Sequence, residues 1–324
     1  MYFYCISYQA FILALRYQMD HDVTMITDAS NIIKACEYLN VKYIIHTEYT
    51  ELDLIKRPKC VKAEITKVLK IIGNHEIHFS HTQYAPFCFL LINKANENGQ
   101  KVVFHDFEFV YDRVDRLPLN KMNLILQFKY FCIKQFYNAP IQLGMSSPGT
   151  YMICLKKDFI QDSNIHIIHD NEIYYDETLK LFRNIDLPRI DIKILFIAQT
   201  FDNEKFFERN AIEEVLNILN IEQVHIKMHP KLNSTNTLLN CKKLPDFLPV
   251  EFYFKSVNNI VISFHSASLI TASKFNHLKV ISLFDIVGKK NEFSKKVKNK
   301  LLEKSDNRIL FPSNINELIL LLNE

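Results

Sequence analysis

Glycine is scarce in this chain, with five residues among 324. Phosphate-binding loops of the GxGxxG and GxxxxGK[ST] types need two or more closely spaced glycines, because the backbone approaches the phosphate oxygens. Neither pattern occurs in the sequence. The chain therefore has neither a P-loop nor the glycine-rich fingerprint of dinucleotide-binding proteins. A phosphate would have to be bound by other groups.

Long apolar runs and a strong net charge are also missing. No run approaches the roughly 18–20 apolar residues that span a bilayer, and residues 1–5 lack the positive start of a signal peptide. The formal net charge of +3 does not indicate a nucleic-acid partner. We expect a soluble, cytoplasmic protein. A peripheral contact with the inner face of the cytoplasmic membrane is left open, because the lysines of residues 289–300 suit either an anionic membrane or a solvated helix face.

The seven cysteines are an odd number, and no two have CxxC spacing. This favours a reducing compartment and buried thiols over a disulfide or zinc framework. His75, His78 and His81 have a spacing that suggests a metal site, but side chains of an extended segment alternate between faces and need not converge. We therefore expect no metal and no cofactor.

Strand patterns alternate with helical ones throughout, which predicts an α/β fold with parallel sheets covered by helices. The length suffices for two domains, and linker character near residues 176–190 separates two similar halves. We predict two Rossmann-like domains, residues 1–180 and 181–324, that face each other across a cleft. Expected strands are 2–6, 23–26, 43–46, 68–72, 101–106, 192–198, 224–229, 256–263 and 280–284. Expected helices are 10–19, 31–38, 86–95, 121–136 and 203–219, with one starting near 266.

One apolar strand pattern, residues 224–230, ends at His229 and Pro230. Ligands of open α/β sheets bind beyond the carboxyl ends of the strands. An imidazole at that position can bind or protonate a departing phosphate, because its pKa lies near neutrality. The alternative is a structural histidine in front of a turn proline.

A second strand pattern, residues 260–269, ends at a cluster of small hydroxyl side chains. Ser266 and Ser268 lie where a helix is expected to begin, which suits an oxyanion. Plain N-capping by Ser266 is the alternative. His265 either orients this cluster or is a polar loop residue.

Two carboxylates lie at the end of the strand expected at residues 101–106. Asp106 is its last residue, and Glu108 comes two residues later. Alternation places them on one face, among the phenylalanines of residues 104–109. A carboxylate in apolar surroundings has a raised pKa and makes a competent general base. A salt bridge to Arg113 or Arg116 is the alternative.

Five segments follow one another along the chain in a defined order. They are Ser7-Tyr8-Gln9 and residues 196–200, 227–230, 248–251 and 263–269. Together they resemble the Ser-Pro-x-Gln opening, the Gly-Gln-Pro strand end, the His-Pro motif, the Pro-x-Glu element and the Ser/Thr motif of one group of enzymes. That group is the bacterial sialyltransferases of GT-B architecture, including lipooligosaccharide sialyltransferases and capsular polysialyltransferases. The likeness covers most of the second half and little of the first.

The chain departs from that family at several of these positions. The acidic base motif is represented by His105-Asp106-Phe107, which leaves Asp106 and Glu108 as alternative bases. Ala267 replaces a second hydroxyl of the Ser/Thr motif, and Ala198 and Thr200 replace the Gly and Pro of the strand end.

The resemblance implies a GT-B enzyme with an acceptor-side first domain and a CMP-sugar-binding second domain. It implies a metal-independent, inverting transfer of sialic acid from CMP-sialic acid to a hydroxyl of a bacterial surface glycan. The acceptor would be O-antigen, lipooligosaccharide or capsule, lipid-linked forms included, and the enzyme would belong to lipopolysaccharide or capsule biosynthesis.

The resemblance also implies roles for individual residues. Asp106 or Glu108 would take the acceptor proton, and His229 would stabilise the departing CMP phosphate. Glu251 would lie near the cytidine. The remaining donor-binding positions would be Ser7, Gln199, Lys227, Pro230, His265, Ser266 and Ser268.

Three alternatives stay open. The donor could be another CMP-activated nonulosonate or Kdo on the same scaffold. The enzyme could be a CDP-glycerol-type glycerophosphotransferase, which also places His and Ser around a CMP leaving group. The chain could instead be a nucleotide-binding scaffold of a polysaccharide assembly complex.

Overall fold

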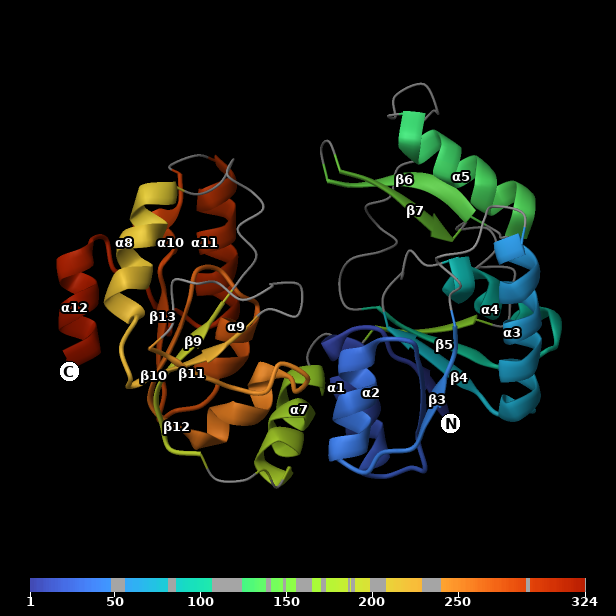
Figure 1. Cartoon of the computed structure of the whole chain (residues 1–324), viewed down its shortest axis with the longest axis horizontal. Helices are drawn as coiled ribbons and strands as arrows, with labels where there is room; N and C mark the ends of the chain where they lie inside the picture. The colour runs from blue at the N-terminus through green and yellow to red at the C-terminus, as the bar shows by residue number, and fades with distance from the viewer. Residues whose placement is uncertain are drawn as a thin grey trace. The chain divides into compact units, whose positions relative to one another are not determined.

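The computed structural model describes most of the chain and divides it into two compact units, Met1–Thr178 and Leu179–Glu324 (Figure 1). The described residues are 1–47, 56–80, 86–106, 124–137, 141–147, 150–155, 165–169, 173–185, 187, 190–198, 208–228, 240–289 and 292–323. The helix α7 (Ile173–Asn184) crosses the division between the units. The sequence-based boundary lay between residues 180 and 181.

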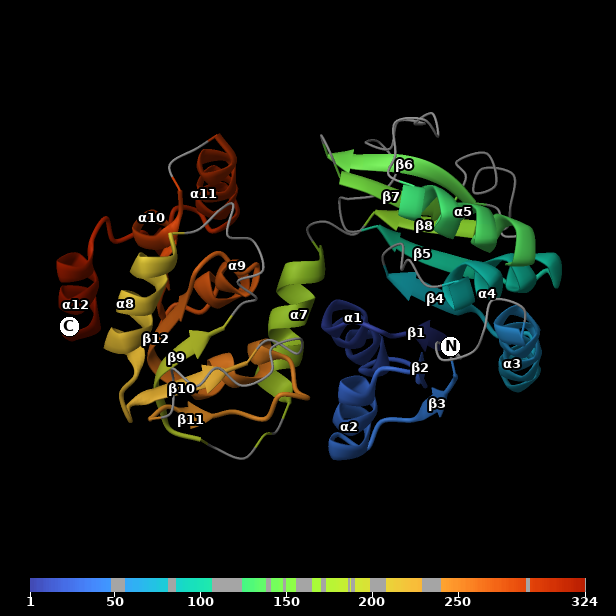
Figure 2. The same ribbon diagram turned by 45° about the horizontal axis from the view of Figure 1, so that its top comes forward.

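The first unit is built on a parallel sheet of six strands in the order β3-β2-β1-β4-β5-β8. Its strands are β1 (Tyr2–Tyr4), β2 (Thr24–Thr27), β3 (Tyr43–Ile45), β4 (Ile77–Ser80), β5 (Val102–Asp106) and β8 (Ile165–His169). Counted along the chain within this sheet, the order is 3-2-1-4-5-6, which is that of a Rossmann fold. Figure 2 shows these strands side by side.

Helices cover both faces of this sheet. On one face, Tyr4, Ile26 and Phe79 pack with α3 (Lys56–Ile72) and α4 (Pro86–Glu97). On the other face, the rings of Phe3 and Tyr17 lie 5.1 Å apart, which brings α1 (Tyr8–Gln18) onto the sheet. The helix α2 (Ser30–Tyr38) contacts the same face, where Cys36 Sγ lies 3.6 Å from Met25 Sδ.

The strand expected at residues 68–72 is wrong, because these residues form the last turns of α3. Val61, Ile65, Val68 and Ile72 are all buried. Their spacing of three and four residues is helical, and an apolar run as short as 68–72 cannot by itself distinguish a strand from a buried helix end. The strand of this region is β4, which starts five residues later at Ile77.

The predicted helix at residues 86–95 is confirmed as α4, which starts at Pro86. Proline suits the first turn of a helix, because its missing N–H would have no helical acceptor there. The chain leaves the helix through Gly99, whose φ of +71° favours glycine.

An antiparallel hairpin and a helix complete the first unit. The strands β6 (Ile141–Ser147) and β7 (Thr150–Leu155) pair with each other, and α5 (Leu124–Tyr137) precedes them. The sequence analysis placed a turn at residues 145–149. Residues 145–147 instead belong to β6, so only the position where the chain reverses was anticipated.

The second unit repeats the same strand order. Its parallel sheet runs β11-β10-β9-β12-β13-β14, which is again 3-2-1-4-5-6 in chain order. The strands are β9 (Ile192–Ile197), β10 (Val224–Lys227), β11 (Lys242–Lys243), β12 (Val257–Ser263), β13 (Lys279–Ser282) and β14 (Ile309–Leu310). The predicted α/β class with two Rossmann-like units is therefore confirmed.

Both faces of the second sheet are also covered. One face packs against α8 (Arg209–Leu219), α10 (Phe284–Val287) and α12 (Ile315–Asn323). The remaining elements are the 3₁₀ helix η2 (Val250–Ser256), α9 (Ser268–Ser273) and α11 (Glu292–Lys304). The rings of Phe182 in α7 and Phe252 in η2 lie 5.7 Å apart, so α7 packs on η2.

Two sequence expectations concern the whole chain. Six of the seven cysteines, Cys5, Cys36, Cys60, Cys88, Cys132 and Cys241, are free thiols. Within the described ranges, every helix is too short or too polar to cross a membrane.

Candidate functional site

The candidate site lies where the strand order of the second sheet reverses. From β9 the chain first adds β10 and β11 on one side of this strand. It then adds β12, β13 and β14 on the other side. Loops leaving such neighbouring strands diverge at their carboxyl ends and leave a crevice that binds ligands in open α/β sheets. The site is therefore expected beyond Ile197, Lys227 and Ser263, which end β9, β10 and β12.

Hydrogen bonds join these three strand ends. The buried Ser263 hydroxyl donates to the Ile197 carbonyl at 2.9 Å, across the reversal point. The N–H of Ala198 donates to the Lys227 carbonyl at 3.0 Å. Ser263, at the end of an otherwise apolar strand, thus holds together the ends of the strands that carry the site side chains.

The loop after β12 carries the predicted serines. Ser268 is the first residue of α9, and Ala267 rather than Ser266 is its N-cap. The Ser266 hydroxyl nevertheless accepts a hydrogen bond from the Ser268 N–H at 3.3 Å. The expected N-cap is therefore wrong by one residue, because the hydroxyl closes a turn just before the helix.

Glu251 and Ser268 meet although they are 17 residues apart. The Ser268 hydroxyl donates to Glu251 Oε1 at 2.6 Å. Glu251 stands near the start of η2 between the buried Val250 and Phe252. Burial raises the pKa of the Glu251 carboxyl, and the Ser268 hydroxyl and the nearby Lys227 oppose that rise. The carboxylate is thereby held at a partly buried position beside the strand ends.

Lys227 brings a cation to the same place. It is the last residue of β10, only 3% exposed, and its Nζ donates to the Asp246 carbonyl at 2.9 Å. Burial lowers the pKa of Lys227 to about 8, while Asp246 and Glu251 act in the opposite direction. An anionic ligand would stabilise this ammonium, because burial disfavours its charged form.

His265 precedes Ser266 on the loop between β12 and α9. Its ring centroid is 5.7 Å from that of Phe284, and burial lowers the pKa of its imidazole. The ring is therefore neutral near pH 7 and can donate one hydrogen bond and accept another.

The structure thus brings together Lys227, Glu251 and Ser268, with Ser266 and His265 on the adjoining loop. Ser7 belongs to the first unit, where its hydroxyl accepts from the Ala10 N–H at 3.2 Å and caps α1. Within the first unit, Ser7 therefore serves as the N-cap of α1. Asp106 ends β5, but its side chain is not among those described. Glu108, Gln199, His229 and Pro230 lie outside the described residues.

Two features of the site escaped the sequence reasoning. Asp246 positions Lys227 through its backbone carbonyl, which no residue type could reveal. The Ser263 bond to Ile197 links strands that are far apart in sequence. The polar end of an apolar run was the visible signal for Ser263, but its partner depends on strand order.

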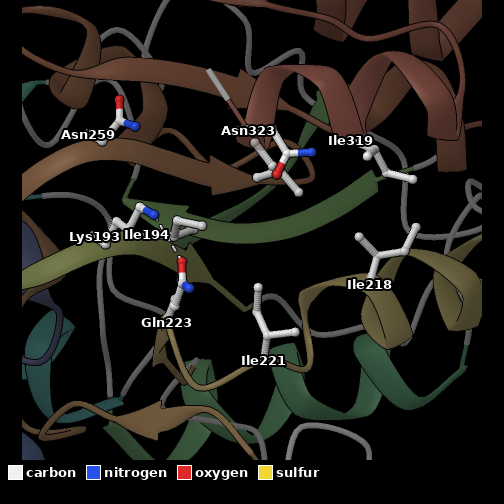
Figure 3. A pocket seen from close by; sticks show the side chains of 9 residues that line it. Lys193, Ile194, Ile218, Ile221, Gln223, Asn259, Ile319 and Asn323 are labelled. Atoms are coloured by element: carbon white, nitrogen blue, oxygen red, sulfur yellow. Dashed lines mark hydrogen bonds between the residues drawn. The ribbon is translucent and has the colours of Figure 1, made fainter.

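A cavity of about 410 Å³ lies at the opposite edge of the same sheet. Figure 3 shows Lys193, Gln223 and Asn259 near the amino ends of β9, β10 and β12, with isoleucines of α8 and α12 around them. The ammonium of Lys193 donates to the Gln223 amide oxygen at 3.0 Å. The cavity therefore lies away from the carboxyl ends that carry the candidate site.

Only part of the spacing of His75, His78 and His81 lies within the described residues. His78 Nδ1 lies 3.0 Å from His105 Nε2, and its Nε2 lies 3.2 Å from Glu76 Oε1. His81 is outside the described residues. Among the residues that the structure describes, no three His, Cys, Asp or Glu side chains are grouped as metal ligands.

Comparisons with known proteins give a fold likeness only. No protein-family model and no curated protein sequence matches the chain. Among solved structures, the glycosyltransferase SnogD from Streptomyces nogalater is similar with a TM-score of 0.47 and 9% identity, over 99% of this chain and 89% of that one. A putative UDP-N-acetylglucosamine 2-epimerase from Listeria monocytogenes is similar with a TM-score of 0.46 and 10% identity, over 95% and 89%.

A third structure, UDP-GlcNAc 2-epimerase from Methanocaldococcus jannaschii, has a TM-score of 0.45 and 14% identity, over 100% of this chain and 91% of that one. At such identities and TM-scores, these similarities define neither a reaction nor a substrate for this chain.

Proposed function

We propose that the chain is a glycosyltransferase that moves sialic acid from CMP-sialic acid to a hydroxyl of a bacterial surface glycan. The observation that carries the proposal is the meeting of Lys227, Glu251 and Ser268 at the strand-order reversal of the second unit. These residues come from three of the segments that resemble the sialyltransferase motifs. Sequence resemblance and spatial convergence therefore support the same donor site.

The charges of the group suit a nucleoside monophosphate. Carboxylates accept hydrogen bonds from ribose hydroxyls in dinucleotide-binding proteins, and Glu251 in η2 offers such an acceptor. The Lys227 ammonium balances the single negative charge of the phosphodiester in a CMP-sugar. This division of roles requires no divalent cation, so the proposal includes a metal-independent reaction.

The reaction itself is a single displacement with inversion. The acceptor oxygen forms a bond to the anomeric carbon of the sialic acid, and the bond from that carbon to the CMP phosphate oxygen breaks. Asp106 or Glu108 takes the proton of the acceptor hydroxyl, and His229 stabilises or protonates the departing phosphate. Because the transition state is oxocarbenium-like, positioning and stabilisation of the leaving group contribute most of the acceleration.

The supporting donor contacts come from the rest of the predicted set. Ser266 and His265 would hold the phosphate oxygens, and Ser268 would serve the donor site by holding Glu251 in place. Gln199 and Pro230 would border the same crevice. Ser7 would complete the donor-binding set. The acceptor would be a glycan of lipopolysaccharide or capsule biosynthesis, lipid-linked forms included, handled in the cytoplasm or at the inner face of its membrane.

Other reactions would use the same constellation. The donor could be CMP-Kdo or the CMP-activated form of another nonulosonate. Such a donor differs from CMP-sialic acid in its sugar and makes the same CMP contacts. A glycerophosphotransferase would accept CDP-glycerol instead, and a nucleotide-binding scaffold would bind CMP without turnover. CMP-Kdo and CDP-glycerol are therefore assayed beside CMP-sialic acid.

The test is release of CMP from CMP-sialic acid by the purified chain, with a glycan acceptor and with EDTA. We expect turnover in EDTA and its loss in Glu251→Gln, with Glu222→Gln as the matched control, since Glu222 is exposed. Turnover with CDP-glycerol alone would replace the proposed reaction by glycerophosphate transfer. CMP binding without turnover of any donor would favour the scaffold.

A further inference from the structure

A second polar pair lies at the carboxyl edge of the first sheet. Asp28 directly follows β2, and His46 directly follows β3. These strands are parallel neighbours in which Thr27 is paired with Ile45, so the next residues of both strands lie side by side on one face. His46 Nε2 and Asp28 Oδ1 are 3.8 Å apart. That distance is longer than a hydrogen bond but short enough for a small rotation to form one.

The His46 ring is fixed by aromatic contacts. Its side chain is 0% exposed, and its centroid lies 3.9 Å from that of Phe87 with the planes 12° apart. Tyr4 stacks on it at 5.4 Å. Its backbone N–H donates to the Thr27 carbonyl at 3.1 Å, which holds the loop start against β2. The imidazole therefore cannot turn away from Asp28 without disturbing the core beside β1.

The ring nitrogens of His46 are both buried, and neither has a hydrogen-bond partner among the described residues. Burial lowers the pKa of His46 to about 4, so the ring is neutral near pH 7. A neutral imidazole carries one donor and one acceptor, and leaving both unused costs stability. A buried polar group without a partner in the protein calls for an explanation, and a bound ligand is one.

Asp28 is the member of the pair that a ligand can reach. Its side chain is 27% exposed, and burial raises the pKa of its carboxyl, against the effect of its own backbone hydrogen bond. Within the described part of the chain, the structure records a contact of its carboxylate with His46 at 3.8 Å. A carboxylate has about four acceptor sites. Its negative charge repels a phosphate, so the pair suits hydroxyl groups rather than the phosphate of a donor.

We propose that Asp28 and His46 form a subsite for the hydroxyl groups of a sugar, and that this sugar is the glycan acceptor. The identification of that sugar as the acceptor rests on the proposed glycosyltransferase function. Asp28 accepts hydrogen bonds from adjacent hydroxyls, which are donors without charge. His46 donates to the second carboxylate oxygen and holds the carboxylate in its binding orientation. Asp28 is thus a binding residue and His46 a positioning residue.

Binding is measured first, without reference to activity, on the full chain labelled with ¹⁵N-histidine. The His46 ring signals are assigned as those missing from His46→Gln, and the protein is titrated with lactose, sialyllactose, maltose and, as a simple polyol, glycerol. We expect at least one sugar to shift the His46 ring nitrogens saturably, and glycerol to have no such effect. His46 signals that no sugar moves, or that glycerol moves equally, would overturn the inference.

Variants then test the direction of the contact. Asp28→Asn should weaken binding of the responding sugar about tenfold, whereas Asp22→Asn should not, because Asp22 is exposed and paired with Lys42 on the same unit. Thermal unfolding checks that each variant folds. If Asp28→Asn does not fold, Asp28→Glu retains the charge but displaces it, and should weaken binding as well. Unaltered affinity in a folded Asp28 variant would contradict the subsite.

Kinetics separate this inference from the proposed function. With CMP-sialic acid as donor, Asp28→Asn should raise the KM for the acceptor sugar about tenfold and change kcat less than threefold. If Glu251→Gln abolishes turnover and Asp28→Asn leaves the KM for the acceptor unchanged, the proposed subsite is wrong and the proposed function stands. Sugar-dependent His46 shifts in a chain that turns over no CMP-sugar would sink the proposed function and leave a sugar-binding site.

Discussion

The hydroxyl of Ser268 donates a 2.6 Å hydrogen bond to Glu251 Oε1, and so joins the start of α9 to η2. The bond stabilises the ionised carboxyl, whose pKa burial otherwise raises. It also aligns Glu251 with the end of β10, where Lys227 lies. One hydroxyl thus sets both the charge and the orientation of the group that is proposed to hold the donor.

Replacing Ser268 by alanine should therefore impair donor use. Without the hydroxyl, the pKa of Glu251 rises further, so the acid limb of the pH profile of kcat/KM should move to higher pH. We expect kcat/KM for the donor to fall about tenfold near neutrality, on the order of the contribution of a hydrogen bond to a charged group. Ser30→Ala, an exposed serine of the first unit, is the control. An unmoved pH profile in Ser268→Ala would show that Glu251 does not act as a carboxylate.

Lys227 should make donor affinity sensitive to mildly alkaline pH. Its pKa of about 8 means that the ammonium loses its proton well below the usual range of lysine. The KM for the CMP-sugar should therefore rise as pH increases through 8. Lys227→Met should raise the KM at least tenfold at pH 7 and remove this pH dependence. Lys243→Met, at an exposed position of β11, should behave like the parent chain. A wild-type KM that stays flat from pH 7 to 9.5 would contradict the assignment.

Buried histidines of the first unit should make it sensitive to acid. Burial lowers the pKa of His46 to about 4, of His78 to about 4 and of His105 to about 3. Because the unfolded chain takes up these protons near pH 6.5, the stability due to neutral histidines is present above that pH and is lost as the pH falls toward the folded values. The expected slope is up to about 1.4 kcal/mol per pH unit for each histidine.

Urea unfolding at pH 7, 6 and 5 measures this slope. His105→Gln should reduce it by about one proton, although it also costs stability at pH 7 through lost contacts with His78 and Phe3. His277→Gln, at an exposed position of the second unit, should leave the slope as it is. Equal slopes in the parent chain and in His105→Gln would mean that His105 is protonated in the folded protein.

The Ser263 hydroxyl should contribute to the stability of the second sheet. Ser263→Ala removes its donor to the Ile197 carbonyl and leaves that buried oxygen without this bond. We expect a loss of about 1–2 kcal/mol in the free energy of unfolding and a loss of donor affinity beyond it, because the strand ends of the site loosen. Denaturant unfolding and CMP titration check the two effects. A stability change with unaltered CMP affinity would confine Ser263 to a structural role.

The regular parts of the fold could be predicted from local sequence, because alternation of apolar runs with helical spacing is a local property. Residues 68–72 show the limit, since a five-residue apolar run fits the end of α3 as well as a strand. Strand order, by contrast, follows from contacts between distant segments. It decides that Ser263 meets Ile197 and that His46 lies next to Asp28, and neither pairing is visible in the residues themselves.

The candidate site divides in the same way. Polar residues at the ends of apolar runs marked His229 and the Ser266–Ser268 loop, because strand ends are readable from sequence. Lys227 was indicated only by the family resemblance. The contact of Ser268 with Glu251 depends on the path of η2, which is irregular and leaves no periodic pattern. The roles proposed for His229, Gln199 and Glu108 stay predictions, since these residues are outside the described part of the chain.

The most direct measurement is the rate of CMP release from CMP-sialic acid by the purified chain in EDTA, compared with Lys227→Met and with the exposed-site variant Lys243→Met. The account predicts acceptor-dependent release that EDTA does not affect, that Lys227→Met reduces at least tenfold at subsaturating donor, and that Lys243→Met preserves. Absence of release from CMP-sialic acid, or equal rates in the two lysine variants, would contradict it.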